Sequence, residues 1–173
     1  MNKYQQKMQS LQFYYIRNGE RKERNLEHIK QIEKELGYTL PTDYVDFILH
    51  YGGCGFSDVS YPLIDYCPIG DRQLLSICFG ILPKDSYDLL NNYCTFRERI
   101  PPNLLPIGGD GMGNLVCLSI NGDDKESVYF WQHDAEEIVG SNEHQGYPED
   151  IYLSAKSFDQ FINSLEIDDE DDE

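Results

Sequence analysis

The sequence has no long apolar run and few basic residues, and each shortage excludes a class of protein. Nowhere does an apolar stretch approach the roughly 18 residues that a membrane-spanning helix requires. The first residues, Met1 to Gln6, lack the apolar core of a signal peptide. We therefore expect a soluble, cytoplasmic protein that has no membrane partner.

Cysteine is present, but in no pattern that would organise a fold. The five cysteines are odd in number, lie in apolar segments and form no Cys-x-x-Cys pair. Disulfide frameworks and zinc sites both use paired or closely spaced cysteines, so we expect reduced, buried thiols instead. The five are Cys54, Cys67, Cys78, Cys94 and Cys117.

Acidic residues dominate the charge. The chain has 31 Asp and Glu against 14 Lys and Arg, a net charge of −17. Seven of the acids lie among residues 166–173; without them 24 acids still face 14 bases, a balance of −10. Such a charge repels nucleic-acid phosphates and anionic membranes and favours a partner with a basic surface. Residues 167–173 cannot bury themselves and are expected to form a disordered acidic tail.

Apolar periodicity predicts helices near both ends of the chain and mostly strands between them. Leu26, Ile29, Ile32 and Leu36 recur at helical spacing, and Gly37 suits the C-terminal cap of that helix. Helices are expected at 3–17, 26–36, 41–51, 85–96 and from 157, and strands at 54–64, 73–82, 103–107, 114–120 and 127–133. This order predicts an α+β fold with helices packed on one side of a mostly antiparallel, curved sheet.

The length of 173 residues indicates one domain with short additions at its ends. We expect an N-terminal helical extension at 1–24, a single domain at 25–166 and the tail at 167–173. In the last helix, Ser157 and Gln160 have the spacing of a capping box.

The strand predicted at 127–133 carries large rings on alternate positions. Val128 and Phe130 point to one face, and Tyr129, Trp131 and His133 point to the other. These rings either belong to the core or, if the second face is open, form an aromatic anchor ringed by acids. Tyr and Trp are enriched in binding hot spots, and acids around them speed the encounter with a basic partner. The candidate partner-binding residues are Tyr61, Asp65, Asp110, Tyr129, Trp131 and His133.

A glycine-rich run could suggest a phosphate cradle. Phosphate loops open onto a helix N-terminus, whereas Gly109-x-Gly111-x-Gly113 opens a predicted strand, carries Asp110 and lacks a following Lys-Ser/Thr. A bulge or tight turn that requires glycine is the expected structure.

Other catalytic patterns are equally incomplete. His133 and Asp134, with Glu136 and Glu137, lack further ligands that the sequence places beside them, and no Gly-x-Ser-x-Gly elbow is present. We therefore expect no enzyme activity, no catalytic residue, no metal and no cofactor.

Three segments, in order, resemble the SUKH superfamily, which includes fungal cell-wall-assembly and killer-toxin-resistance regulators and many bacterial immunity proteins. Residues 33–53 resemble its opening, with a helix, the Leu40-Pro41 step, a second helix and the Gly52-Gly53 stop. Residues 105–134 resemble its central glycine-led hairpin, and residues 154–161 its closing helix. The resemblance covers about residues 25–166.

The resemblance implies an α+β fold and protein binding rather than catalysis. Bacterial relatives are typically encoded beside polymorphic toxins, often nucleases, and neutralise them. It therefore implies an immunity protein that occludes the active site of a cognate toxin, here one with a basic surface. The alternative is a non-enzymatic intracellular scaffold or regulator, like the fungal relatives. The identity of the toxin, the stoichiometry and the oligomeric state stay open.

Overall fold

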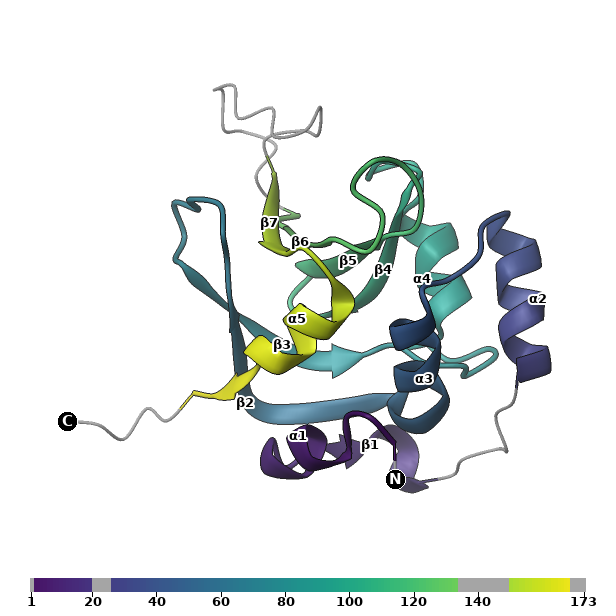
Figure 1. Ribbon diagram of the computed structural model, residues 1–173, viewed down its shortest axis with the longest axis horizontal. Helices are drawn as coiled ribbons and strands as arrows, with labels where there is room; N and C mark the ends of the chain where they lie inside the picture. Colours follow the sequence, from purple (N-terminus) through teal and green to yellow (C-terminus); the bar gives the residue numbers. More distant parts are fainter. Residues whose placement is uncertain (1, 20–25, 134–149, 169–173) are drawn as a thin grey trace.

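The computed structural model describes residues 2–19, 26–133 and 150–168. These residues form helices and an antiparallel sheet, which confirms the predicted α+β class (Figure 1). The helices are α1 (Gln5–Ser10), α2 (Leu26–Leu36), α3 (Thr42–Tyr51), α4 (Leu89–Phe96) and α5 (Phe158–Ser164). The strands are β1 (Tyr14–Tyr15), β2 (Cys54–Pro62), β3 (Arg72–Cys78), β4 (Leu104–Gly109), β5 (Leu115–Ser119), β6 (Val128–Trp131), β7 (Ile151–Ala155) and β8 (Glu166–Ile167).

The strands follow one another in space in the order of the sequence, from β1 to β7. The last strand, β8, pairs with β2, with Ile167 opposite Val59, and β1 also pairs with β2, with Tyr14 opposite Gly55. Because β3 occupies the other edge of β2, β1 and β8 lie one after the other along the same edge.

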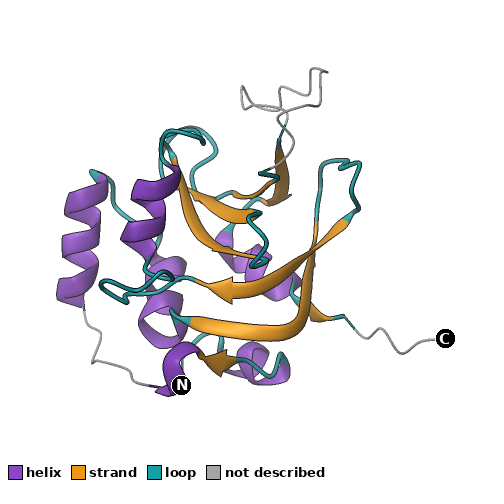
Figure 2. Cartoon of the chain, turned by 180° about the vertical axis from the view of Figure 1, so that it is seen from behind, coloured by secondary structure: helices purple, strands orange, loops and turns teal. Residues whose placement is uncertain are grey.

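Helices α3 and α5 cover one face of the sheet with interlocking rings. The ring of Phe158 on α5 lies 5.2 Å from that of Tyr44 and 5.3 Å from that of Phe47, both on α3. Figure 2, viewed from behind, shows the strands in front of α5. The predicted helix cap is confirmed, since the Ser157 hydroxyl accepts a hydrogen bond from the Gln160 N–H at 3.0 Å.

The N-terminal helix is shorter than predicted. The segment that contains it packs into the hydrophobic core. Helix α1 ends at Ser10 instead of reaching residue 17, and Gln12 takes a positive φ of 55° that turns the chain into β1. Tyr4, Met8 and Leu11 are buried in the same hydrophobic cluster as the sheet and helices. Residues 1–24 therefore include core-forming positions.

Lys3 connects this segment to α3 and α5 through two ion pairs. Its Nζ lies 2.9 Å from a carboxylate oxygen of Asp43 on α3 and 2.9 Å from one of Asp159 on α5. The hydrogen bond from Lys3 lowers the pKa of Asp159, and the Tyr4 hydroxyl donates a second bond at 3.1 Å.

Ionised Asp159 stabilises the wild type near neutral pH, and this contribution is lost in acid. We predict that Asp159→Asn lacks this pH-dependent contribution. A carboxyl with a lowered folded pKa stabilises the fold above its unfolded pKa of about 3.9 and loses that contribution as the pH falls through the folded pKa. The variant should therefore be less stable than the wild type near neutral pH and close to it in acid. Urea unfolding at both pH values measures this, with exposed Asp123→Asn as control. Identical pH dependence in the wild type and Asp159→Asn would contradict the prediction.

Two further expectations need correction. Helix α4 begins at Leu89, where Asp88 caps it by accepting a bond from the Asn91 N–H, and it buries Leu89 and Asn92. The helix is therefore shorter at its start than the predicted range of 85–96, and Cys94 is an exposed thiol whereas the other four cysteines are buried.

The predicted tail is also shorter at its start. Ile167 of β8 pairs with Val59, and the Asp168 N–H donates to the Asp58 carbonyl at 2.6 Å, so both residues bond to β2. Residues 169–173 lie outside the described residues. None of the helices in the described ranges has the length and apolarity to span a membrane.

Candidate interaction surface

The aromatic face predicted on β6 is covered, so of the two alternatives left open by the sequence Trp131 takes the first and belongs to the core. Its side chain is only 2% exposed. The Phe96 ring packs edge-on at 5.8 Å and the Arg99 guanidinium lies 4.9 Å from the indole centre. The indole N–H donates to Asp150 Oδ2 at 2.8 Å. Strand alternation predicted the face correctly, but the end of α4 and its following turn pack on it.

Tyr129 and Tyr61 are buried as well, which corrects their expected exposure. The Tyr129 hydroxyl donates to Asp124 Oδ2 at 2.6 Å, and the Tyr61 ring packs on Phe161 of α5 at 5.1 Å. Burial raises the pKa of Tyr61 well above its ordinary value, so its hydroxyl stays neutral. Neither ring offers surface to a partner in this fold.

Asp110 and His133 meet around Asn114 in the glycine loop between β4 and β5. Asp110 accepts bonds from the Met112 N–H at 2.8 Å and from the Asn114 side-chain amide at 2.8 Å. The side-chain carbonyl oxygen of Asn114 in turn accepts a hydrogen bond from the His133 backbone N–H at 3.1 Å. A role in partner binding stays a prediction for both residues, which are half-buried.

The loop itself is a tight turn. Gly111 and Gly113 have positive φ angles of 79° and 110°, and a Cβ at Gly113 would lie 2.7 Å from the His133 ring. In the described residues, no three His, Cys, Asp or Glu side chains come together as a metal site would require. Asp134, Glu136 and Glu137 lie outside those residues.

Asp65 lies apart from the other candidates and protects the edge of β7. Its carboxylate accepts from the Leu153 N–H at 2.8 Å, while the Ile64 and Asp65 N–H groups donate to the Leu153 carbonyl at 2.8 and 3.1 Å. The Ser154 hydroxyl also donates to the Pro62 carbonyl at 2.8 Å. The chain after β2 thus covers the outer side of β7, which would otherwise be an open edge.

We predict that Asp65→Ala lowers the free energy of unfolding by about 1–2 kcal/mol, because the Leu153 N–H loses its acceptor in a half-buried position. Hydrogen exchange of the Leu153 amide should speed up in the same variant. Asp71→Ala, which removes an exposed carboxylate from the same connection, is the control. Unchanged exchange at Leu153 would show that Asp65 does not hold this edge.

The connection between β2 and β3, with the first half of β3, carries many of the exposed apolar side chains of the described residues. Three of the eight large exposed apolar side chains lie in the connection and a fourth in β3, and we call these four the hairpin surface: Ile64 (54% exposed), Tyr66 (81%), Ile69 (49%) and Leu74 (49%). Single exposed apolar residues are ordinary, whereas several on one hairpin are a candidate interaction surface.

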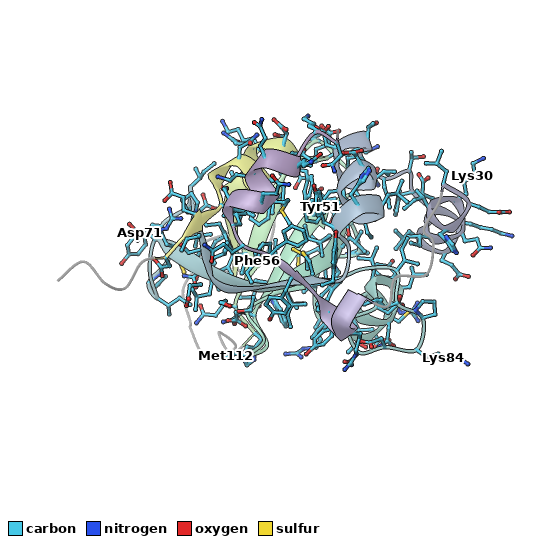
Figure 3. All side chains as sticks on the ribbon, turned by 90° about the horizontal axis from the view of Figure 1, so that it is seen from below. Lys30, Tyr51, Phe56, Asp71, Lys84 and Met112 are labelled. Atoms are coloured by element: carbon cyan, nitrogen blue, oxygen red, sulfur yellow. The ribbon has the colours of Figure 1, made fainter. Side chains whose placement is uncertain are left out.

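Acidic groups surround the hairpin surface. Strands β2, β3 and β8, with the connection and Asp168, hold five acids and a single base, Arg72. Arg72 donates to the Ser60 hydroxyl at 3.0 Å and lies 3.5 Å from the Glu166 carboxylate. In Figure 3, Asp71 stands at one end of the molecule and Lys30 and Lys84 at the other. The five acids are Asp58, Asp65, Asp71, Glu166 and Asp168.

Sequence reasoning missed the hairpin surface, although a signal was present. Pro68 and Gly70 mark a turn, and large apolar residues beside a turn cannot all reach the core. The six sequence candidates are not one site: Asp110 and His133 share Asn114, whereas Asp65 lies at β7.

Comparison with known proteins matches the chain to a sequence family, a relative and a solved structure. The sequence model of the SMI1 / KNR4 family (SUKH-1) matches residues 25–164. The SPbeta prophage-derived uncharacterized protein YokK of Bacillus subtilis is 33% identical over 166 residues, which covers 84% of this chain and 79% of that protein. A crystal structure of a protein from Pseudomonas syringae pv. tomato matches with a TM-score of 0.47 and 17% identity, over 83% of this chain and 86% of that one.

Proposed function

Because the chain belongs to the SMI1 / KNR4 family (SUKH-1), we propose that it is an immunity protein that binds a cognate bacterial toxin and occludes its active site. The hairpin surface is the observation that carries the proposal. It presents Tyr66 and three aliphatic side chains together, and apolar side chains with a tyrosine are typical of interface centres. Occlusion requires no chemistry from the inhibitor, so the proposal assigns no catalytic residue.

Charge supports a basic partner. Five acids and one engaged arginine surround the hairpin surface, and the whole chain carries −17. A nuclease is the toxin class that this charge favours, because a site that binds nucleic-acid phosphates is basic. Opposite charge would also speed association, which matters for a protein that must act before its toxin does.

Co-expression with a toxin encoded beside this gene tests the proposal. The wild type should restore growth and co-purify with the toxin. The double variant Tyr66→Ala/Ile69→Ala should bind at least about tenfold more weakly, because it removes two exposed apolar contacts. The matched control Tyr14→Ala/Leu26→Ala removes two equally apolar, exposed side chains elsewhere and should retain binding. No growth rescue by the wild type, or equal loss in both double variants, would contradict the proposal.

A further inference from the structure

Strand β3 is paired from end to end on only one side. On the β2 side, the pairs run from Arg72 opposite Pro62 to Cys78 opposite Cys54, with a register shift between Gly55 and Val59, whereas on the β4 side only Ile77 and Cys78 are paired, with Gly109 and Gly108. Residues 72–76 therefore have no strand beside them on the second side within the described ranges. Figure 2 shows β2 and β3 as the long pair of the sheet. An unpaired stretch of strand presents N–H and C=O groups that can pair with another chain.

The open side follows from where β4 ends. After Gly109, Asp110 accepts bonds from the Met112 and Asn114 backbone N–H groups and turns the chain into the glycine loop. The β2–β3 hairpin continues five residues past this point. Because of the turn at Asp110, β4 does not extend beside residues 72–76 of β3, and no other strand in the described part of the chain does.

The edge strands β1 and β7 are short or covered, and in this respect they differ from the open stretch of β3. Strand β1 has two residues, and β7 is covered by Asp65 and its neighbours. Natural sheets commonly protect an exposed edge with lysine, proline or a bulge. Residues 72–76 include no lysine or proline, and Leu74 in their middle is 49% exposed; the irregularity of the β2–β3 pair lies on β2, between Gly55 and Val59.

We propose that the protein partner docks by adding an extended, basic segment to β3 along residues 72–76, with its apolar side chains packed on the hairpin surface. This mode rests on the proposed function and specifies how that surface recognises its partner. Main-chain hydrogen bonds supply affinity in strand addition, and alternate side chains supply specificity. The partner segment therefore alternates apolar residues with lysine or arginine.

Charge selects this occupant over a second copy of the chain. Two copies pairing edge to edge would bring two acidic hairpins together, each with Asp71 next to the first residue of β3, and each chain carries −17. The positive charges of a basic segment are instead attracted to these carboxylates. The proposal commits to a heterologous partner for this reason.

Hydrogen exchange measured by NMR tests the mode with a defined probe, an eight-residue peptide of alternating lysine and valine. The peptide should slow exchange of backbone amides within residues 72–76, and a glutamate–valine peptide of equal length should not. Slowed exchange elsewhere only, or no effect of either peptide, would overturn the proposal. Protection of residues 72–76 that grows with protein concentration alone, with a doubled mass, would identify a second copy as the occupant and overturn it too.

Leu74→Lys provides the matched variant, with Leu26→Lys as control, since both replace an exposed leucine by the same cation. Leu74→Lys should weaken binding of the lysine–valine peptide about tenfold or more, because it removes the apolar contact and repels the peptide. Leu26→Lys should leave binding unchanged, and circular dichroism should show both variants folded. Equal binding by the two variants would overturn the proposal.

The same variants separate this inference from the proposed function. If the wild type and Leu74→Lys rescue growth from the toxin equally, strand addition at β3 is wrong and the immunity role stands. If the peptide protects residues 72–76 but the wild type rescues no growth, the immunity role is wrong and the docking edge stands.

Discussion

Replacing Trp131 by alanine is expected to lower the free energy of unfolding by about 3–5 kcal/mol, the usual cost of removing a buried tryptophan. The indole is 2% exposed and packs between the Phe96 ring and the Arg99 guanidinium. Its removal leaves a cavity between β6 and the end of α4 that the surrounding backbone cannot fill. Urea unfolding followed by circular dichroism measures the loss, and Met112→Ala, at 75% exposure, is the control.

Trp131→Phe separates the packing from the hydrogen bond. It keeps a ring in place but removes the N–H that Asp150 Oδ2 accepts at 2.8 Å. The other Asp150 carboxylate oxygen, Oδ1, is buried and has no partner within the described residues. Losing the indole donor should therefore cost about 1–3 kcal/mol. A loss of under about 1 kcal/mol in Trp131→Ala would show that the ring is a surface anchor and restore the interpretation rejected above.

Gly80→Ala should be similarly damaging, at about 3 kcal/mol or more, although it adds a single methyl group. A Cβ at this position would lie 2.4 Å from the Gly52 carbonyl carbon and 2.4 Å from the Gly53 nitrogen. Both are backbone atoms at the end of α3, so no side-chain rotation can relieve the clash. The chain after β3 crosses the end of α3 at this point.

Gly37→Ala is the matched control for Gly80→Ala. Gly37 has a φ of 79°, but a Cβ there would meet nothing within 4 Å, so the variant carries only the cost of a left-handed backbone, about 1 kcal/mol. Comparing midpoints of thermal unfolding for the two variants isolates the effect of close backbone approach. A Gly80→Ala variant as stable as Gly37→Ala would show that α3 and the β3 end can separate without loss.

Local signals predicted the elements that depend on them. The spacing of apolar residues located α2, Ser157 and Gln160 placed the start of α5, and the strands expected at 114–120 and 127–133 are β5 and β6. The α+β class followed from the order of these elements. The family resemblance over 25–166 agrees with the match at 25–164.

The rest depended on contacts between distant residues, which no local pattern encodes. Alternation placed Trp131 and Tyr129 on one face of β6 but could not show that Phe96 and Arg99 would cover that face. Asp65 was a plausible surface acid until its bond to Leu153, 88 positions away, gave it a structural role. The open edge of β3 likewise depends on where β4 ends.

The pairing of β1 and β8 along one edge of β2 has a consequence for synthesis. Tyr14 can pair only after Gly55 has been synthesised. Val59 can pair with Ile167 only when that residue emerges from the ribosome, more than a hundred residues later. During translation the second half of β2 can pair with β3 but lacks its β8 partner until residues 166–167 have left the ribosome. A ribosome that stalls before residue 166 would leave a nascent chain with this edge exposed to aggregation.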